Sequence, residues 1–349
     1  MLILLLLLAA ICLVGIKFDS FHNDYIGKEQ TTSIKGIFAI IILFSHLKGY
    51  IELSGPLDSA FCSILNYIGQ LMVAIFFFYS GYGVLISFVN KKDYDRTFFK
   101  NRLLKTLLHF DIAVLIYTVL NLILGKTYGA SHYALSFIGW SSVGNSNWFI
   151  FDTLALYLVT YFVFLFIRAS KTSKNIKITT SILTAFATCA LIAFLSITKR
   201  DAGSWWYNTL LCYPAGMIFY TIKDKLDHFF KKHKKMYYVT GLFVFIVFIA
   251  LYLRSSFITY NLCACCFCIL IILMNMKLKI ENPILNWLGI HSFSIYILQR
   301  LPMIVLSHIG LSSNKYLFSV CSILFTLTIS FLFEKMLKQI DKHFFKSLF

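Results

Sequence analysis

Two ionisable residues interrupt one apolar stretch near the start of the chain, and together they could do acid–base chemistry. Lys35 and His46 lie within SIKGIFAIIILFSHLKGY, residues 33–50, eleven positions apart. In an α-helix that separation is three turns with ~20° left over, so both side chains share one stripe, roughly 16 Å apart along the axis. Ionisable groups inside membrane helices usually face the bundle interior and mark a functional path. The alternative is that Lys35 reaches the membrane surface and His46 makes a structural contact with another helix.

The composition indicates the class of protein that positions these residues. The 349 residues are 59% hydrophobic and 17% aromatic, with a mean hydropathy of +0.77. Soluble domains are usually ~45–50% apolar. Apolar runs of ~20 residues recur along the chain, and each is long enough to cross ~30 Å of hydrocarbon. We therefore predict an all-α polytopic membrane protein with about eleven transmembrane helices, at residues 2–16, 34–51, 68–89, 105–124, 147–167, 178–197, 205–222, 237–253, 257–275, 285–308 and 317–334.

The net charge of +17 is distributed as a topology signal. Most Lys and Arg residues fall in alternate connections, such as 91–102, 168–177 and 223–235, and in the tail at 336–349. By the positive-inside rule those segments are cytoplasmic. The sequence thus predicts a multi-pass protein of the plasma (inner) membrane with its N-terminus outside and its C-terminus inside. This distribution argues against a nucleic-acid partner.

The nine cysteines form no disulfide framework, because nearly all of them fall in apolar spans. The run CACCFC at residues 263–268 lacks the paired spacing of zinc ligands. Cysteine in such a span usually packs as a small apolar residue. We therefore expect no metal site.

A cluster of basic residues lies at the predicted cytoplasmic start of the fourth span. It consists of Lys100, Arg102 and Lys105, and the last two are three apart and share a helix face. Such a cluster commonly attracts anionic lipid headgroups. The functional alternative is a phosphate clamp, since Arg grips phosphate with two donors and Lys acts as a point charge.

Further polar residues are expected within the outer half of the membrane. Asp152 lies about one turn inside its span without a local cation, so it should point into the bundle as a candidate for binding an acceptor hydroxyl. Arg300 lies deep in the span 285–308, and Asp152 is its expected partner on charge and depth. Tyr296 supplies a hydroxyl in the same span, and Trp148 is typical of an aromatic anchor at the interface.

Several of these motifs resemble the acyltransferase-3 family of polytopic membrane proteins, which modify surface glycans with acyl groups. The basic residue, ten intervening residues and histidine from Lys35 to His46 resemble its first motif. FFKNRLLKTLL, at 98–108, resembles its pair of arginines three apart, with a lysine as the second member. NWF at 147–149 and GIHSFSIY at 289–296 resemble two further stretches. The sequence departs from the family at Gln299, where a histidine is common, and at Ala74, where an acid or a proline is common.

The resemblance implies a ten-helix core that begins with residues 34–51. The domain is then 34–335, residues 1–16 are an extra N-terminal transmembrane helix, and 336–349 form a basic cytoplasmic tail. Residues 1–16 lack the basic start and the clean cleavage site of a signal peptide.

The resemblance also implies an O-acyltransferase that moves an acyl group, acetyl above all, from cytosolic acyl-CoA to a hydroxyl of a surface or lipid-linked polysaccharide. His46 would be the general base, and Lys35 would be the second catalytic residue of the same motif. Arg102, Lys105 and Lys100 would bind the donor, and Asp152, Arg300, Tyr296 and Trp148 would contact the acceptor.

Two other classes of function remain open at this stage. A transporter or flippase for a glycan or lipid-linked precursor would also carry buried charges such as Asp152 and Arg300. A structural subunit of polysaccharide synthesis or export machinery is the other alternative.

Overall fold

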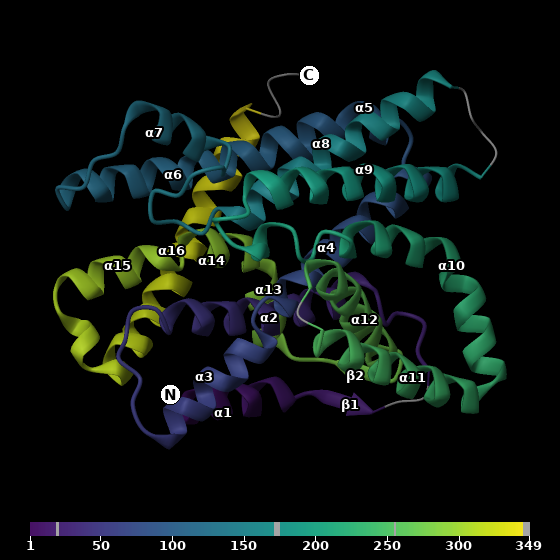
Figure 1. The fold of residues 1–349 in the computed structure, drawn as a ribbon, viewed down its shortest axis with the longest axis horizontal. Helices are drawn as coiled ribbons and strands as arrows, with labels where there is room; N and C mark the ends of the chain where they lie inside the picture. The colour runs from purple at the N-terminus through teal and green to yellow at the C-terminus, as the bar shows by residue number, and fades with distance from the viewer. Residues whose placement is uncertain (19–20, 171–174, 255, 345–349) are drawn as a thin grey trace.

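The computed structural model describes residues 1–18, 21–170, 175–254 and 256–344, and its regular structure is almost entirely helical (Figure 1). The longer helices are α2 (Lys28–Leu47), α3 (Pro56–Ile68), α4 (Leu71–Asn90), α6 (Lys105–Ile123), α8 (Trp148–Ala169), α9 (Ile176–Thr198), α10 (Cys212–Lys232), α11 (Lys234–Tyr252), α12 (Phe257–Asn275) and α16 (Lys315–Phe344). The shorter ones are α1 (Leu2–Leu13), α5 (Tyr94–Phe98), α7 (Ala130–Phe137), α13 (Pro283–Ile290), α14 (Ser292–Leu298) and α15 (Arg300–His308). Strands β1 (Ile16–Phe18) and β2 (Leu278–Ile280) pair antiparallel. The predicted all-α class is confirmed.

Fewer helices qualify as membrane crossings than the sequence predicts. Within the described residues, eight helical segments are long and apolar enough to span a bilayer, and one bent pair makes a possible ninth. The predicted span 205–222 fails because α10 starts only at Cys212 and carries Lys223, Asp224 and Lys225 in its second half. The predicted basic connection 168–177 and the tail 336–349 lie partly outside the described residues.

The predicted first span is also shorter than expected. The helix α1 has 12 residues, which is about 18 Å and too short for ~30 Å of hydrocarbon. It ends because Gly15 adopts a φ of 77°, and the chain then extends into β1. The backbone of Gly15 accepts a hydrogen bond from the Glu281 amide at 2.9 Å, so this segment is tied to the chain that follows β2.

The predicted span 285–308 is broken. Asn282 and Pro283 begin α13 as expected, because the Asn282 side chain accepts hydrogen bonds from the amides of Ile284 and Leu285 at 2.9 and 3.0 Å. After Ile290 the chain bends by 60° before it continues into α14 and α15. Polar groups of the bend are satisfied locally; the Nδ1 atom of His291, for example, lies 2.8 Å from the Trp287 carbonyl oxygen.

The helices α2 and α13 occupy the middle of the molecule in Figure 1, with α6 to α9 on one side and α1 and α3 on the other. Two glycines allow them to touch along their backbones. A Cβ atom on Gly36 would lie 2.1 Å from the Leu285 carbonyl oxygen, and one on Gly289 would lie 1.8 Å from the Thr32 carbonyl oxygen. Small residues permit such close helix packing in membranes. The contact holds α2 in a fixed orientation.

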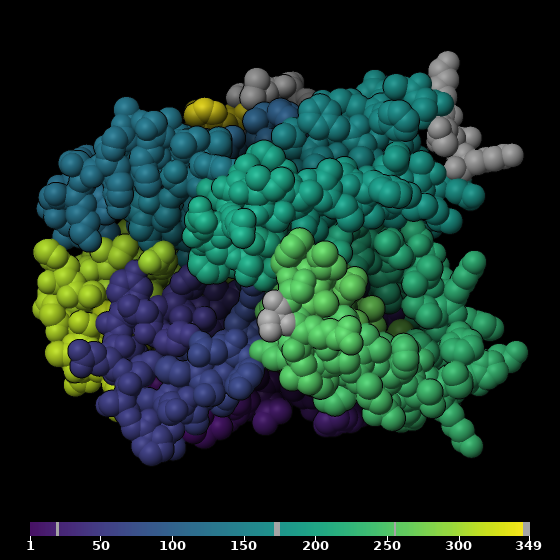
Figure 2. Space-filling model, viewed as in Figure 1, coloured from purple at the N-terminus to yellow at the C-terminus, as the bar shows by residue number. Residues whose placement is uncertain are grey.

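Two apolar clusters surround α2. The larger joins α4, α8, α10 and α12, and the smaller joins the far end of α2 with α3, α15 and α16. In the smaller cluster Phe61 and Leu65 of α3 are grouped with Met303 and Leu306 of α15. Figure 2 shows the result on the surface, where the segment containing α3 (blue) lies next to the one containing α15 (yellow-green). Segments far apart in sequence thus enclose one central helix.

Candidate functional site: a cavity along the central helix

One face of α2 lines a cavity inside the helix bundle. Lys28, Lys35, Ala39 and Ile42 line it, and His46 follows one turn later on the same stripe. At 100° per residue these five side chains fall within an arc of about 60°. The helix thus presents a continuous face that runs from two lysines to a histidine.

The cavity has a volume of about 540 Å³, within the range of ~300–1,000 Å³ typical of small-molecule sites. It lies where α2, α4, the start of α6, α8 and α14 meet, and most of its wall is apolar or aromatic. The aromatic lining residues are Phe76, Phe77, Tyr79, Phe149, Tyr157, Phe293 and Tyr296. A long, thin and largely apolar molecule fits such a wall.

Positive charges gather in this lining. Arg102 joins Lys28 and Lys35, and none of the described residues that line the cavity is acidic. Arg102 lies in a π-helical turn, Phe99–Leu104, and its Nε atom donates a hydrogen bond to the Tyr94 hydroxyl at 3.3 Å. Such turns are common at functional sites. Three cations without a carboxylate favour an anionic ligand.

The rest of the predicted basic cluster lies elsewhere. Lys105 pairs with Asp341 of α16 at 2.6 Å, and the Nε2 atom of His109 lies 2.9 Å from the same carboxylate. Neither Lys105 nor Lys100 belongs to the cavity lining. The helical turn that follows Arg102 therefore connects to α16, whereas Arg102 itself faces the cavity.

His46 packs against residues that come from two later segments of the chain. Its Nε2 atom lies 3.5 Å from the hydroxyl oxygen of Ser146, a buried residue just before α8. Arg300 interacts electrostatically with the imidazole, and its Nε atom donates a hydrogen bond to the Tyr50 hydroxyl at 3.1 Å. A potential base, a hydroxyl and a fixed cation are thus brought together one turn beyond the cavity.

The prediction that Asp152 and Arg300 form an ion pair is wrong. Asp152 is fully buried, and neither of its carboxyl oxygens has a hydrogen-bond partner within the described residues. The cation that interacts with it is Lys199, which follows α9, the neighbour of α8. Arg300 is instead held by Tyr50, beyond the end of α2.

Lys199 lies in an aromatic box that the sequence did not reveal. Its Nζ atom donates a hydrogen bond to the Trp140 carbonyl at 2.8 Å and lies 3.6 and 4.1 Å from the ring centres of Trp140 and Trp206. Burial lowers the pKa of Lys199, and the nearby Asp152 carboxyl opposes that shift. The box joins the chain before α8 to the chain after α9.

The hydroxyls of the GIHSFSIY stretch, residues 289–296, divide between two faces. Ser292 and Tyr296, one turn apart on α14, line the cavity. Ser294 faces away from it and donates a hydrogen bond to Glu334 of α16 at 3.4 Å. Trp148 lies outside the cavity lining, although its neighbour Phe149 forms part of the wall.

Three polar residues of this region were not predicted. Ser80 and Tyr157 line the cavity, and their hydroxyl oxygens lie 3.0 Å apart. Ser146 contacts His46 and directly precedes the NWF stretch, which is a signal that could have pointed to it. Tyr157 occurs in an ordinary apolar helix without any comparable signal, whereas Ser80 belongs to IFFFYSGYG, residues 75–83, whose small residues favour close helix packing.

The cysteine run lies within α12, away from this cavity. Cys263 and Cys268 are buried, and Cys265 lies 3.9 Å, sulfur to sulfur, from Cys212 of α10. In the part of the chain that the structure describes, no group of three His, Cys, Asp or Glu residues could hold a metal ion. The run serves as packing between α10 and α12.

The fold and the cavity define a polytopic helical membrane protein with an internal, cation-lined site. A family model described as an acyltransferase domain matches residues 32–335. Because this match covers nearly the whole chain, the protein belongs to the acyltransferase-3 family and is a membrane acyltransferase that transfers groups other than aminoacyl groups. Neither the search of curated proteins nor the search of solved structures found a match.

Proposed function

We propose that the protein transfers an acyl group, acetyl above all, from cytosolic acyl-CoA to a hydroxyl of a cell-surface or lipid-linked polysaccharide. One observation carries the proposal: the cation-lined cavity follows the face of α2 that leads to His46. A polyanionic donor with a long, thin arm matches this arrangement of charge and shape. The basic connections predicted to be cytoplasmic, such as 91–102, lie on the donor side in this proposal.

The donor is held in two parts. Its phosphates bind to Lys28, Lys35 and Arg102, where the described lining contains no acidic residue and so favours negative charge. Its pantetheine arm extends between aromatic side chains such as Phe77 and Phe149. Lys100 and Lys105 contribute only to the long-range attraction, because they lie outside the lining.

The reacting groups meet near His46. The imidazole takes the proton of the acceptor hydroxyl while the hydroxyl oxygen attacks the thioester carbonyl. The carbon–sulfur bond then breaks, an ester forms, and the thiolate of CoA leaves with the proton that the imidazole returns. Arg300 supplies positive charge for the oxyanion that develops on the carbonyl.

One turn of helix separates the cavity from this base. Ile42 is the last residue of α2 in the lining, and His46 follows about 6 Å farther along the axis. Tyr296 of α14 also lines the cavity and is the candidate to position the thioester or the acceptor. Asp152 has no exposed surface, so we assign it no direct contact with the acceptor.

The test is acyl transfer by the purified protein in proteoliposomes, with labelled acetyl-CoA and surface polysaccharide as the acceptor. We expect His46→Ala to lower the rate by about 1,000-fold, because general bases contribute roughly 100- to 10,000-fold. His308→Ala, at an exposed site at the end of α15, is the matched control and should transfer normally. Normal transfer by the folded His46→Ala protein would remove His46 as the base. Mass spectrometry of surface glycans with and without the protein identifies the acyl group.

A further inference from the structure

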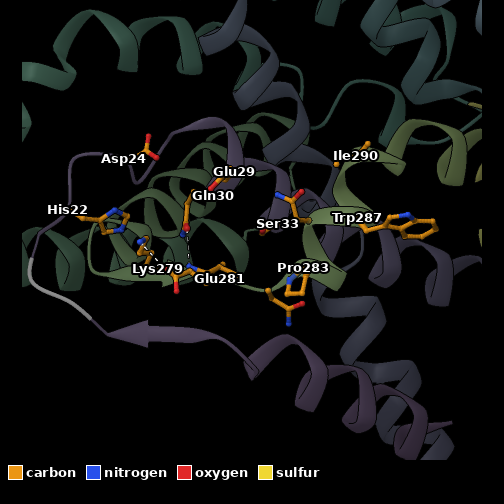
Figure 3. A pocket seen from close by; sticks show the side chains of 13 residues that line it. His22, Asp24, Glu29, Gln30, Ser33, Lys279, Glu281, Pro283, Trp287 and Ile290 are labelled. Carbon is orange, nitrogen blue, oxygen red and sulfur yellow. Dashed lines mark hydrogen bonds and ion pairs between the residues drawn. The ribbon is translucent and has the colours of Figure 1, made fainter. Parts of the chain in front are cut away.

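A second pocket lies on the opposite side of α2 and plays no part in the proposed transfer. It has a volume of about 590 Å³ and is formed by the start of α2, the segment before it, β2 and α13. Figure 3 shows its two ends: His22, Glu29, Lys279 and Glu281 on one side, and Trp287 and Ile290 on the other.

The floor of this pocket is a rigid structure. The Gln30 side chain donates a hydrogen bond to the Leu278 carbonyl at 2.9 Å and accepts one from the Ile280 amide at 3.0 Å, so it bridges α2 to β2 (Figure 3). The Asn282 side chain donates to the carbonyls of Ile11 and Val14 at 2.7 and 3.0 Å. These bonds join the pocket wall to the last turn of α1 and to the residue that follows it. The pocket is therefore preformed.

Its polar lining carries more negative than positive charge. Asp24, Glu29 and Glu281 contribute carboxylates, whereas Lys279 is the ammonium among the described lining residues. Hydrogen bonds from Lys17 and Lys279 lower the pKa of Glu281 to about 2, so it stays ionised. Asp24 and Glu29 have no ion-pair partner in the described part of the chain. In a protein with a net charge of +17, these two carboxylates favour a positive group in the pocket.

Two further polar groups of the lining indicate what kind of cation fits. Ser33 lines the pocket with only 2% of its surface exposed, and its hydroxyl has no hydrogen-bond partner among the described residues. The Nε2 atom of His22 lies 3.2 Å from the Leu278 carbonyl oxygen, so it carries the proton and leaves Nδ1 as an acceptor. Carboxylates, a hydroxyl and an imidazole nitrogen together suit a group with several N–H donors.

The opposite end of the pocket is apolar and faces outward. Ile290 is 56% exposed, and Ile284, six residues earlier on α13, is 55% exposed. In a membrane protein such side chains contact acyl chains. Trp287 lies with Ile290 at this end, away from the carboxylates (Figure 3), and tryptophan is typical of membrane interfaces. The pocket therefore suits an amphipathic occupant.

We propose that this pocket binds one phosphatidylethanolamine molecule of the surrounding bilayer. Its primary ammonium lies against Glu29 and Asp24, its phosphate lies near Lys279, and its acyl chains leave past Trp287 and Ile290. Anionic headgroups are repelled by the surplus carboxylates. Choline headgroups lack the N–H donors that the acceptors require. The site is independent of the acyl donor and of His46.

The first test is native mass spectrometry of the purified full-length protein with equal amounts of dioleoyl phosphatidylethanolamine, phosphatidylglycerol and phosphatidylcholine. We expect preferential retention of phosphatidylethanolamine, and about fivefold lower retention in Glu29→Gln, as for the loss of one partly exposed ion pair. Glu52→Gln, at an exposed carboxylate beyond the other end of α2, is the control and should retain the lipid. Equal retention of all three lipids, or a preference for phosphatidylglycerol, overturns the proposal.

A second readout locates the lipid. Phosphatidylethanolamine with brominated acyl chains should quench a component of the tryptophan fluorescence that is missing in Trp287→Phe. Brominated phosphatidylglycerol at the same concentration should quench that component less. If the two lipids quench wild-type protein equally, or if Trp287→Phe shows the same quenching as wild type, the lipid does not occupy this pocket.

Discussion

The cavity and the pocket lie on two sides of one helix, and their chemistry is opposite. The cavity takes Lys28 and Lys35 from α2 and has no acid among its described lining residues, whereas the pocket takes Glu29, Gln30 and Ser33. At 100° per residue the two sets point in opposite directions from the helix axis. In our two proposals, a few residues at the start of α2 thus bind an anion on one side and a cation on the other. Helical periodicity alone separates the two sites.

The largest effect that separates the two sites is expected from a substitution that fills the cavity. Ala39 lines it between Lys35 and Ile42, so Ala39→Phe places a ring in the path to His46. We expect acyl transfer to fall by about 100-fold, the loss typical of a misplaced reactant, while phosphatidylethanolamine retention stays unchanged. Ala39→Ser is the control, because it adds one atom. A normal rate in a folded Ala39→Phe protein would show that the donor does not pass this point.

A substitution in the contact between α2 and α13 should affect both sites together. Gly36→Ala places a methyl group 2.1 Å from the Leu285 carbonyl oxygen, which forces the helices apart. We expect a loss of about 2 kcal/mol in stability, as for other overpacked positions. A thiol-reactive dye that detects exposure of buried cysteines such as Cys263 measures it on heating.

The control for that substitution is Gly83→Ala, because nothing lies within 4 Å of a Cβ atom at Gly83. If Gly36→Ala unfolds at the wild-type temperature and both ligands still bind, α2 and α13 do not need this close contact.

Removing the Arg102 charge should weaken ligand binding in the cavity and leave lipid binding in the pocket unchanged. We expect Arg102→Ala to lower the affinity for acyl-CoA by about tenfold, in line with the loss of a charge-assisted hydrogen bond. Added salt should weaken donor binding in the wild type more than in the variant, because screening acts on the same charge. The matched control is Arg96→Ala. The Arg96 side chain is 61% exposed and pairs with Asp93 outside the cavity. Equal donor affinities for both variants would exclude the phosphate clamp.

The smallest effect concerns the group that orients the base. Ser146→Ala removes the hydroxyl 3.5 Å from the His46 imidazole. We expect about a fivefold fall in kcat with little change in the KM for the donor, as for one neutral hydrogen bond. Ser146→Thr keeps a hydroxyl and should restore most of the rate. A change in KM alone would indicate that Ser146 contacts a substrate instead.

Much of the candidate site was predictable because it depends on one helix. Lys35 and His46 belong to a single span, so their spacing alone places them on one stripe. Arg102 was found by its charge at the start of a membrane helix. Ser146, Tyr157 and Lys199 were missed because they come from other parts of the chain, where a serine, a tyrosine or a lysine has no distinctive local pattern.

The expected Asp152–Arg300 pair shows why depth and charge alone cannot predict which residues form an ion pair. Both residues were predicted at similar depth, but depth leaves the direction of each side chain around its helix undetermined. The packing of α8 against α9 brings Lys199 to Asp152, and Tyr50 engages Arg300. For the same reason, residues 285–308 were predicted as one unbroken span. In the structure the chain bends after Ile290, where α13 packs against α2 and the following helices pack against α16.

The sequence by itself determined the helical membrane class, the family and the stripe that joins Lys35 to His46, because hydropathy and helical periodicity are local properties of the chain. Only the tertiary structure decided which cations share a cavity, which residue partners Asp152, and that a second, acidic pocket exists behind α2. Those properties depend on how helices rotate and approach one another, and that is set by distant contacts such as Gly36 with Leu285 and Gln30 with β2.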